Sequence, residues 1–440
     1  MAIPAEAKQL VQAKQKAQAL LDFIDASPSP WHAVSHIVEQ LESNGFKPLI
    51  ENQPWQFRKN GKYYVVRDGA SIIAFIVGDK SIAESGFKII GAHTDSPGLR
   101  LKPKAAFASE GTAQLGVEVY GGPILATFTD RDLSLAGRVI ARHSNGLHTH
   151  FLRLHDPMVR LPNLAIHMNR EVNEKGLVLN KQIGLPLIFG FAADSGEAHQ
   201  QLTSALAQQI NINPEDILTW DLNVYDTQKG VLWGINKEFI ANSQLDNLAS
   251  CHAAIEALIA TQKPDATAIC ALFDHEEVGS ESAAGASGSF MMDVMARICA
   301  STNTSEEDRL RGIANSFFIS ADMAHAFHPN HQGSYEPCHH AHINQGPVIK
   351  TNANQRYSTN AETAARFIQL CKQANVPYQQ YAHRTDLGCG STIGPTLAAQ
   401  LGIASVDVGN PMWAMHSIRE SAGTLDHLYM TQVLMQHFVV

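Results

Sequence analysis

Seven histidine and carboxylate side chains of this 440-residue sequence could together hold metal ions and move a proton. They are His93, Asp95, Asp246, Glu276, Glu277, Asp322 and His416. Three of the carboxylates and the two histidines suit a pair of divalent ions with mixed nitrogen and oxygen ligands. A shared carboxylate holds such a pair about 3.5–4 Å apart, so that the two ions act on the attacking and the leaving atoms.

Two carboxylates remain for roles beside the metal. Because Glu276 and Glu277 are adjacent, Glu277 can bind an ion while Glu276 takes the proton of an attacking water. Asp95 stands two residues after His93 and could orient its imidazole. Each residue alone also fits a simpler role, such as a helix cap for Asp246 or a solvated turn for the glutamates. The dimetal site is predicted from the combination of these residues, several of which follow the ends of predicted strands.

The elements that precede these side chains must bring them together. Short apolar runs predict strands at 62–66, 71–77, 87–90, 268–273, 316–320, 347–350 and 403–408. Helical patterns alternate with the later strands, which predicts an α/β fold with a doubly wound, mainly parallel sheet and helices on both faces. In such sheets, sites form beyond the carboxyl ends of the strands, and there we expect the seven side chains to converge.

The pattern of the sequence changes between about residues 99 and 235. Apolar and polar residues alternate, as in antiparallel strands with one solvated face, over 113–120, 133–142 and 220–224. A helix around 197–210 interrupts the alternation. We therefore expect a catalytic domain made of residues 1–98 plus 236–440, and within it an inserted β-rich unit made of residues 99–235.

Composition excludes several other classes of protein. Apolar residues make up 45% of the chain and charged residues 17%, which is the balance of a large packed core. The formal net charge of -9 argues against nucleic acid or an anionic membrane as a partner, and no apolar run is long enough to span a bilayer. The six cysteines are widely spaced and the first 22 residues hold charges without a compact apolar run, so we expect a cytoplasmic protein with reduced thiols.

Several short motifs make the prediction more specific. They are SPSPWHAV (27–34), GAHTDSP (91–97), QLDN (244–247), DHEEVGS (274–280), SADMAHA (320–326) and AMHSIRE (414–420). In this order they resemble the M18 metallopeptidases, the aspartyl aminopeptidase family, and the resemblance covers essentially the whole chain. It implies a doubly wound catalytic domain interrupted by a β-rich dimerisation domain, and homo-oligomers that are typically closed dodecamers.

The resemblance also implies roles for the seven side chains. The ligands would be His93 and Asp322 for one ion, Glu277 and His416 for the other, and Asp246 as the bridge. Glu276 would be the general base, and Asp95 would support His93. The ions would be zinc, with manganese or cobalt as alternatives. The substrate would be a peptide with a free N-terminus, whose amine binds one ion while water attacks the scissile carbonyl.

Three further residues are implied as parts of the substrate pocket. Lys350 would contact an acidic N-terminal side chain, which favours Asp and Glu as the released residues. His325 would line the pocket, and His167 would reach the site of a neighbouring protomer. As alternatives, Lys350 could be a surface lysine at a strand end, and His167 could be an ordinary exposed histidine.

Two other functions remain open from the sequence. The turn 388–391 holds Cys389 and Ser391, and with His383 nearby it could belong to a cysteine or serine hydrolase. A shell with metal-lined pockets could also be a non-catalytic binding protein, although Glu276 would have no task there. The sequence has no HExxH motif, which excludes a single-zinc protease of that type. The histidine-rich tract 338–342 has one cysteine and no second cluster, so it does not predict a further metal site.

Overall fold

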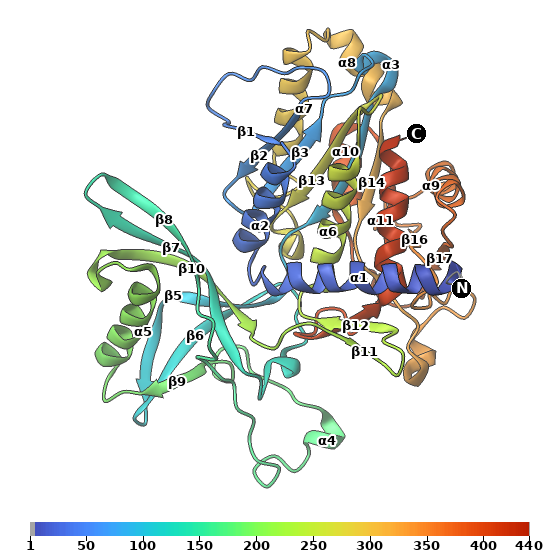
Figure 1. The fold of residues 1–440 in the computed structure, drawn as a ribbon. Helices are drawn as coiled ribbons and strands as arrows, with labels where there is room; N and C mark the ends of the chain where they lie inside the picture. The colour runs from blue at the N-terminus through green and yellow to red at the C-terminus, as the bar shows by residue number, and fades with distance from the viewer. Residues whose placement is uncertain (1–4, 440) are drawn as a thin grey trace.

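The computed structural model describes residues 5–439; residues 1–4 and 440, which the predicted catalytic domain includes, lie outside the described part. The described chain forms three sheets of nine, six and five strands. Figure 1 shows the large sheet and its helices in the upper part of the molecule, with the six-stranded sheet projecting from it at the lower left.

The large sheet has the strand order β1-β2-β3-β13-β4-β14-β18-β16-β17. Its strands are β1 (Lys47–Leu49), β2 (Lys62–Arg67), β3 (Ser71–Ile76), β4 (Phe87–His93), β13 (Thr267–Phe273), β14 (Phe317–Ala321), β16 (Val348–Thr351), β17 (Gln379–Ala382) and β18 (Ala404–Gly409). The central strands β13, β4, β14 and β18 are parallel, whereas β3 and β16 pair antiparallel with the two ends of this group. All seven predicted strands are present, with small shifts at their ends.

Helices cover both faces of this sheet because its central strands are apolar on both sides. In β13, Cys270 and Leu272 face one core while Ile269 and Phe273 face the other. The first core also holds residues of α1 (Ala5–Asp25), α2 (Pro30–Ser43), α6 (Leu245–Ala260), α9 (Ala361–Gln373) and α11 (Thr424–Val439). The second holds residues of α3 (Ile82–Ser85), α7 (Phe290–Ser301), α8 (Glu306–Asn315) and α10 (Ile393–Leu401). The doubly wound α/β architecture is thus confirmed.

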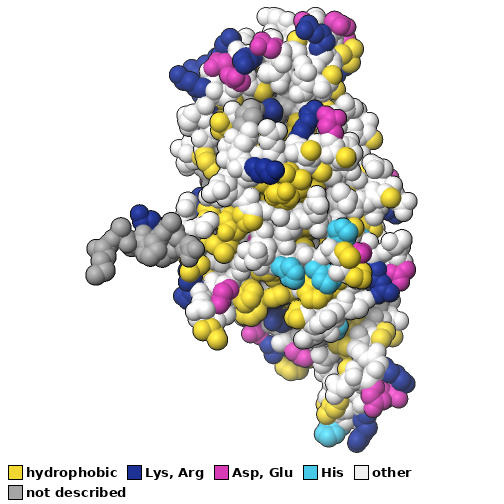
Figure 2. All heavy atoms as spheres, turned by 90° about the vertical axis from the view of Figure 1, so that its right-hand side faces the viewer, with side chains coloured by type: hydrophobic (Ala, Val, Ile, Leu, Met, Phe, Trp, Pro, Cys, Tyr) yellow, Lys and Arg dark blue, Asp and Glu magenta, His cyan; other side chains and the backbone are white. Residues whose placement is uncertain are grey.

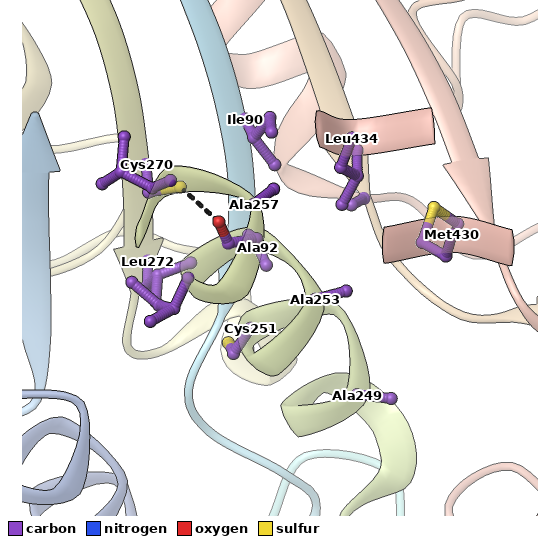
Figure 3. Packing of buried hydrophobic residues seen from close by; sticks show 14 of the residues in the cluster. Ile90, Ala92, Ala249, Cys251, Ala253, Ala257, Cys270, Leu272, Met430 and Leu434 are labelled. Carbon is purple, nitrogen blue, oxygen red and sulfur yellow. Dashed lines mark hydrogen bonds between the residues drawn. The ribbon is translucent and has the colours of Figure 1, made fainter. Parts of the chain in front are cut away.

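Helix α6 is buried between the large sheet and α11, as Figure 3 shows. Its small side chains, among them Ala249, Ala253 and Ala257, let the helix approach its neighbours closely. The Cys270 thiol on β13 donates a hydrogen bond to the backbone carbonyl of α6 at Ala254 (3.1 Å). This packing fixes the start of α6, where Asp246 lies, relative to the strand ends.

The six-stranded sheet is antiparallel throughout, in the order β8-β7-β10-β5-β6-β9. Its elements are β5 (Gly98–Ser109), β6 (Thr112–Tyr120), β7 (Leu133–His143), β8 (Gly146–Arg153), β9 (Leu187–Phe191) and β10 (Ile217–Asp226), with α5 (Ser195–Ile210) packed against the sheet. The antiparallel strands and the helix predicted for this part of the chain are therefore present. The exact domain borders, at 98/99 and 235/236, stay a prediction.

The third sheet joins segments that are distant in the sequence, in the order β11-β12-β20-β19-β15. Its strands are β11 (Val231–Trp233), β12 (Phe239–Asn242), β15 (Ala324–His325), β19 (Pro411–Trp413) and β20 (Glu420–Gly423). Short helical turns complete the fold: η1 (Leu125–Phe128), α4 (Val172–Lys175), η2 (Pro214–Asp216), η3 (Glu276–Val278) and η4 (Pro329–Ser334). Within residues 5–439, none of the helices combines the length and apolar character needed to cross a membrane.

Candidate metal centre

The carboxyl edge of the large sheet carries the side chains predicted to do chemistry. β4 ends at His93, and the loops after β13 and β14 hold the two glutamates and Asp322. His416 follows β18 less directly, in the loop between β19 and β20. Asp246 enters from the first turn of α6, where its backbone departs from helical geometry (φ -84°, ψ 103°). Left-handed backbone at His275 (φ 67°) and His416 (φ 68°) turns the chain sharply at two of these loops, which is typical of functional sites.

The five residues predicted as metal ligands form two groups that share Asp246. In the first group, His93 Nε2 lies 3.3 Å from Asp246 Oδ1 and 3.5 Å from Asp322 Oδ1. In the second group, His416 Nε2 lies 3.5 Å from Asp246 Oδ2 and 3.4 Å from Glu277 Oε1. The two carboxylate oxygens of Asp246 therefore point into different groups.

These two groups fit a pair of divalent ions. Two ligands bound at about 2.0–2.1 Å to a tetrahedral zinc ion lie about 3.3 Å apart, close to the separations of the histidine and carboxylate atoms. Asp246 Oδ1 is buried and has no hydrogen-bond partner among the described residues, a costly arrangement unless a cation lies beside it. Burial also raises the pKa of Glu277 well above its usual range, and the negative charge of Asp246 acts in the same direction. The donor set and its concentration of negative charge suit metal ions.

The buried carboxylate of Asp95 connects its own loop to the end of β6 and to the loop that holds the two glutamates. The Tyr120 hydroxyl on β6 donates to its Oδ2 (2.6 Å), and the backbone N–H groups of Glu276 and Glu277 donate to it at 3.2 and 3.1 Å. His93 Nδ1 lies 3.4 Å from Asp95 Oδ1 and donates to the Asp95 carbonyl oxygen at 3.0 Å. Burial alone would raise the pKa of Asp95, but its pairing with His93 holds that pKa below the usual range. The position therefore suits the predicted support of His93.

Glu276 lies beside the two ligand groups, and its own carboxyl is easily protonated. One of its oxygens lies within 4.8 Å of ligand atoms of His93 and Glu277. Burial raises the pKa of Glu276 to about 8; positive charge on His93 opposes this shift, and the carboxylate of Asp322 adds to it. A group that exchanges its proton near neutral pH is suited to act as both base and acid.

The close approach of two backbones positions Asp322. Its N–H donates to the carbonyl oxygen of Val408 on β18 (2.9 Å). A Cβ atom built on Gly409 would lie 1.7 Å from the carbonyl oxygen of Asp322, so only glycine fits at that position. The strand end that carries Asp322 is thus pressed directly against β18.

Glu420 is a residue of the site to which sequence reasoning assigned no role. It is 1% exposed on β20, and its two oxygens accept from the backbone N–H groups of His416 (2.7 Å) and Asp246 (3.1 Å). One carboxylate therefore holds the backbones of two predicted ligands from different elements. Its place at the end of the AMHSIRE motif was the available signal, but a buried hydrogen bond to distant backbone leaves no periodic pattern in the sequence.

Lys350 is 2% exposed, so the surface-lysine alternative is wrong. Its ammonium donates to Asp322 Oδ2 (3.2 Å) and to the carbonyl oxygen of Met323 (3.0 Å). The neighbouring His325 is neutral because burial and the positive charge of Lys350 lower its pKa to about 4. The structure thus brings Lys350 and His325 to the edge of the first ligand group.

His167 lies apart from these residues. It is exposed in the segment between β8 and β9, and the structure does not bring it to the metal ligands of its own chain. Neighbouring apolar side chains are exposed too, with 70% of Leu164, 47% of Ile166 and 76% of Met168 accessible to solvent. Its proposed role in another protomer's site stays a prediction.

The alternative hydrolase site lacks the necessary contacts. His383 Nδ1 pairs with the Tyr381 hydroxyl (2.7 Å), and the Ser391 hydroxyl donates to the Arg356 carbonyl oxygen (3.3 Å). No hydrogen bond among residues 5–439 joins His383 to Cys389 or to a carboxylate, so no activated nucleophile is formed.

The histidine-rich tract also forms no metal site in the described part of the chain. Figure 2 shows histidine side chains gathered on one face of the molecule. Where three potential ligand atoms converge among residues 5–439, none of the converging residues belongs to 338–342. His339 instead pairs with Glu336 at 2.5 Å.

Comparison with known proteins agrees with this geometry. The family model described as Aminopeptidase I zinc metalloprotease (M18) matches residues 23–438. A relative named Probable M18 family aminopeptidase 2, from Ectopseudomonas mendocina (strain ymp), is 46% identical over 419 residues, which are 95% of this chain and 96% of the relative.

Solved structures are similar over the same length. A chain in the cryo-EM structure of the Ape4 and Nbr1 complex is 39% identical with a TM-score of 0.94, over 100% of this chain and 87% of that one. The S. cerevisiae mApe1 dodecamer is 28% identical with a TM-score of 0.84, over 97% of this chain and 96% of that one. The chain therefore belongs to the M18 family of zinc metallo-aminopeptidases.

Proposed function

We propose that this metallo-aminopeptidase works with two zinc ions per chain and releases acidic N-terminal residues from peptides. The ions would be held by His93 with Asp322, by His416 with Glu277, and by Asp246 between them. The observation that carries this proposal is Asp246, whose two oxygens each lie beside a different imidazole. Zinc bound there would polarise the scissile carbonyl and lower the pKa of water.

Glu276 is the proposed general base. Its carboxylate accepts a proton from the water that forms the new C–O bond. It then donates this proton to the nitrogen of the leaving group as the peptide C–N bond breaks. Asp95 holds the imidazole of His93, and Glu420 holds the backbones of Asp246 and His416, so that the site keeps its shape during the reaction.

Lys350 is the proposed contact for an acidic side chain of the substrate. An ammonium group has three N–H donors, and two of them are taken by Asp322 and Met323. The third is free to bind a substrate carboxylate. His325, neutral and close by, can add a hydrogen bond without adding charge.

We also propose that the chain forms a homo-oligomer in which His167 completes the site of a neighbouring copy. The support is the similar mApe1 chain, which forms a dodecamer, and the exposed apolar side chains beside His167. The cytoplasmic location expected from the sequence stays a prediction.

The first experiment is hydrolysis of aminoacyl-coumarins carrying Asp, Glu, Leu or Lys, with and without prior chelation of the enzyme. Release of Asp and Glu that the chelator abolishes is the expected result. Chelator-sensitive release of Leu or Lys alone would keep the metal mechanism and contradict the acidic pocket. Activity that survives chelation would contradict the metal mechanism and favour the alternative hydrolase site at Cys389.

A lysine variant tests the acidic pocket directly. Lys350→Met should lower the ratio of kcat/KM for Asp to that for Leu at least about tenfold, because the substrate carboxylate loses its charged partner. A tenfold change corresponds to about 1.4 kcal/mol. Lys372→Met, on the exposed face of α9, is the matched control and should leave the ratio unchanged.

A further inference from the structure

A second cluster of potential metal ligands lies where α6 packs against α11. His252 and Glu256 are one helical turn apart on α6, and His427 lies on α11. His252 Nδ1 is 2.9 Å from His427 Nε2 and 3.9 Å from Glu256 Oε2. Ligand atoms of all three residues lie within 4.8 Å of one another. Two imidazole nitrogens and a carboxylate oxygen thus converge on one point.

The two histidines of this cluster are shielded from solvent, and Glu256 is half-buried at its edge. His252 is 4% exposed and His427 is 1% exposed. Helix α1 covers them: the ring of Phe23 lies 5.4 Å from that of His252, and Lys16 Nζ donates to Glu256 Oε1 at 2.7 Å. Burial lowers the pKa of His252 to about 4 and that of His427 further. Both imidazoles are therefore neutral, which is the form that binds metal.

A hydrogen bond between the two histidines does not account for the whole cluster. It leaves Glu256 Oε2 buried without a hydrogen-bond partner among the described residues, although the other oxygen of the same carboxylate is paired with Lys16. An unpaired buried carboxylate oxygen is costly, and a cation beside it removes that cost. Ligand atoms around a tetrahedral zinc ion lie about 3.3 Å apart, between the two separations measured from His252 Nδ1.

We propose that His252, Glu256 and His427 form a structural zinc site that is separate from the catalytic centre. Two nitrogens and one oxygen make a borderline donor set that suits zinc, and water would supply the fourth ligand. Lys16, which donates to Glu256 Oε1, would orient the carboxylate so that Oε2 faces the ion, as polar neighbours of metal ligands commonly do.

The location indicates what the ion does. Asp246 lies in the first turn of α6, and α11 follows β20, which carries Glu420. An ion between His252 and His427 ties these two helices together, and so clamps the elements that hold the catalytic carboxylates in place. Because binding occurs in the folded state, zinc should raise the stability of the chain.

Zinc content tests this proposal. Wild-type protein saturated with zinc and desalted should hold one zinc ion per chain more than Glu256→Gln or His427→Gln, measured by inductively coupled plasma mass spectrometry. His437→Gln, a buried histidine on the same helix outside the cluster, should match the wild type. Glu256→Gln should fold, because its side chain is partly exposed and the amide oxygen can still accept from Lys16. Its zinc content therefore tests the proposal even if His427→Gln fails to fold. Equal zinc content in wild type and Glu256→Gln would overturn the proposal.

Anomalous diffraction at the zinc edge separates this site from the catalytic one. Wild-type crystals should show a peak between His252 and His427 in addition to density near His93 and His416. Peaks near His93 and His416 alone would overturn the structural site and leave the proposed function intact. A peak between His252 and His427 alone would support the structural site and contradict the proposed catalytic pair.

Discussion

Glu276 and Glu277 are adjacent residues whose carboxylates have different surroundings. Glu277 Oε1 faces His416 Nε2 at 3.4 Å and belongs to a ligand group with Asp246. Glu276 lies beside that group, and burial raises the pKa of both carboxyl groups, that of Glu276 to about 8. The proposed division of metal binding and proton transfer between these two residues therefore rests on their positions.

Glutamine substitutions should separate these two tasks. Glu276→Gln should keep the zinc content of the wild type and lower kcat by about 10²–10⁴-fold, because the amide cannot accept the proton of water. Glu277→Gln should lose zinc, since it removes a charged ligand. Metal analysis and steady-state kinetics on both variants check this. If turnover by Glu276→Gln stays near that of the wild type, Glu276 is not the base.

Glu420 provides a second test at the scale of a residue. A glutamine there retains one acceptor oxygen and places an NH₂ group against a backbone N–H donor, so Asp246 or His416 loses its support. We expect Glu420→Gln to weaken zinc binding about 10–100-fold with unchanged far-UV circular dichroism. Competition with a zinc-binding dye measures the affinity. Glu118→Gln, at an exposed position of β6, is the control and should bind zinc like the wild type.

At the scale of elements, helix α11 carries a histidine that should make the fold sensitive to acid. His437 is buried between the aromatic rings of Phe317 and Phe438, and burial together with Lys88 lowers its pKa to about 3. Between pH 6.5 and 3 the unfolded chain therefore binds a proton that the folded chain does not. Protonation of His437 therefore costs the folded state nothing above pH 6.5, and it lowers the free energy of unfolding increasingly as the pH falls towards 3.

Replacement of this histidine should reduce the sensitivity to acid. The expected contribution of His437 is a loss of about 2 kcal/mol in the free energy of unfolding at pH 5. His437→Leu should therefore show a smaller loss than the wild type between pH 7.5 and pH 5. Urea unfolding with chelator present at both pH values measures the difference without a contribution from metal release. His199→Leu, exposed on α5, should keep the wild-type loss; an equal loss in His437→Leu would contradict the assignment.

The sequence predicted most strands of the large sheet, but not the direction of β16 or the third sheet. Apolar runs such as 268–273 identified the strands of the large sheet because alternation and burial are local properties of the chain. The direction of β16 could not be predicted, because pairing with β18 depends on a partner more than 50 residues away. The third sheet was missed for the same reason: its strands are two to four residues long and come from three regions of the sequence.

At the scale of the whole molecule, the exposed apolar side chains around His167 are the surface on which the proposed oligomer depends. The double substitution Ile166→Glu with Met168→Glu should lower the assembled mass because it places charges in an apolar contact. Sedimentation velocity and light scattering measure the mass. Leu310→Glu, on α8, changes an exposed leucine elsewhere and should leave assembly intact.

The same assembly would bring His167 to a neighbouring site. His167→Ala should therefore reduce kcat/KM while the assembled mass stays that of the wild type. A double variant that remains fully assembled would contradict this contact surface, and an unchanged kcat/KM in His167→Ala would contradict its role in catalysis.

The sequence by itself determined the alternation of strands and helices, the family and the identities of the predicted ligands, because each depends on local pattern or on motifs read in order. Only the tertiary structure decided which side chains meet. It placed the two oxygens of Asp246 beside different imidazoles, gave Glu420 its two backbone partners, and brought His252 within 2.9 Å of His427, 175 residues further along the chain. Such contacts join distant segments through packing of whole elements, and that packing leaves no periodic signal in the segments it joins.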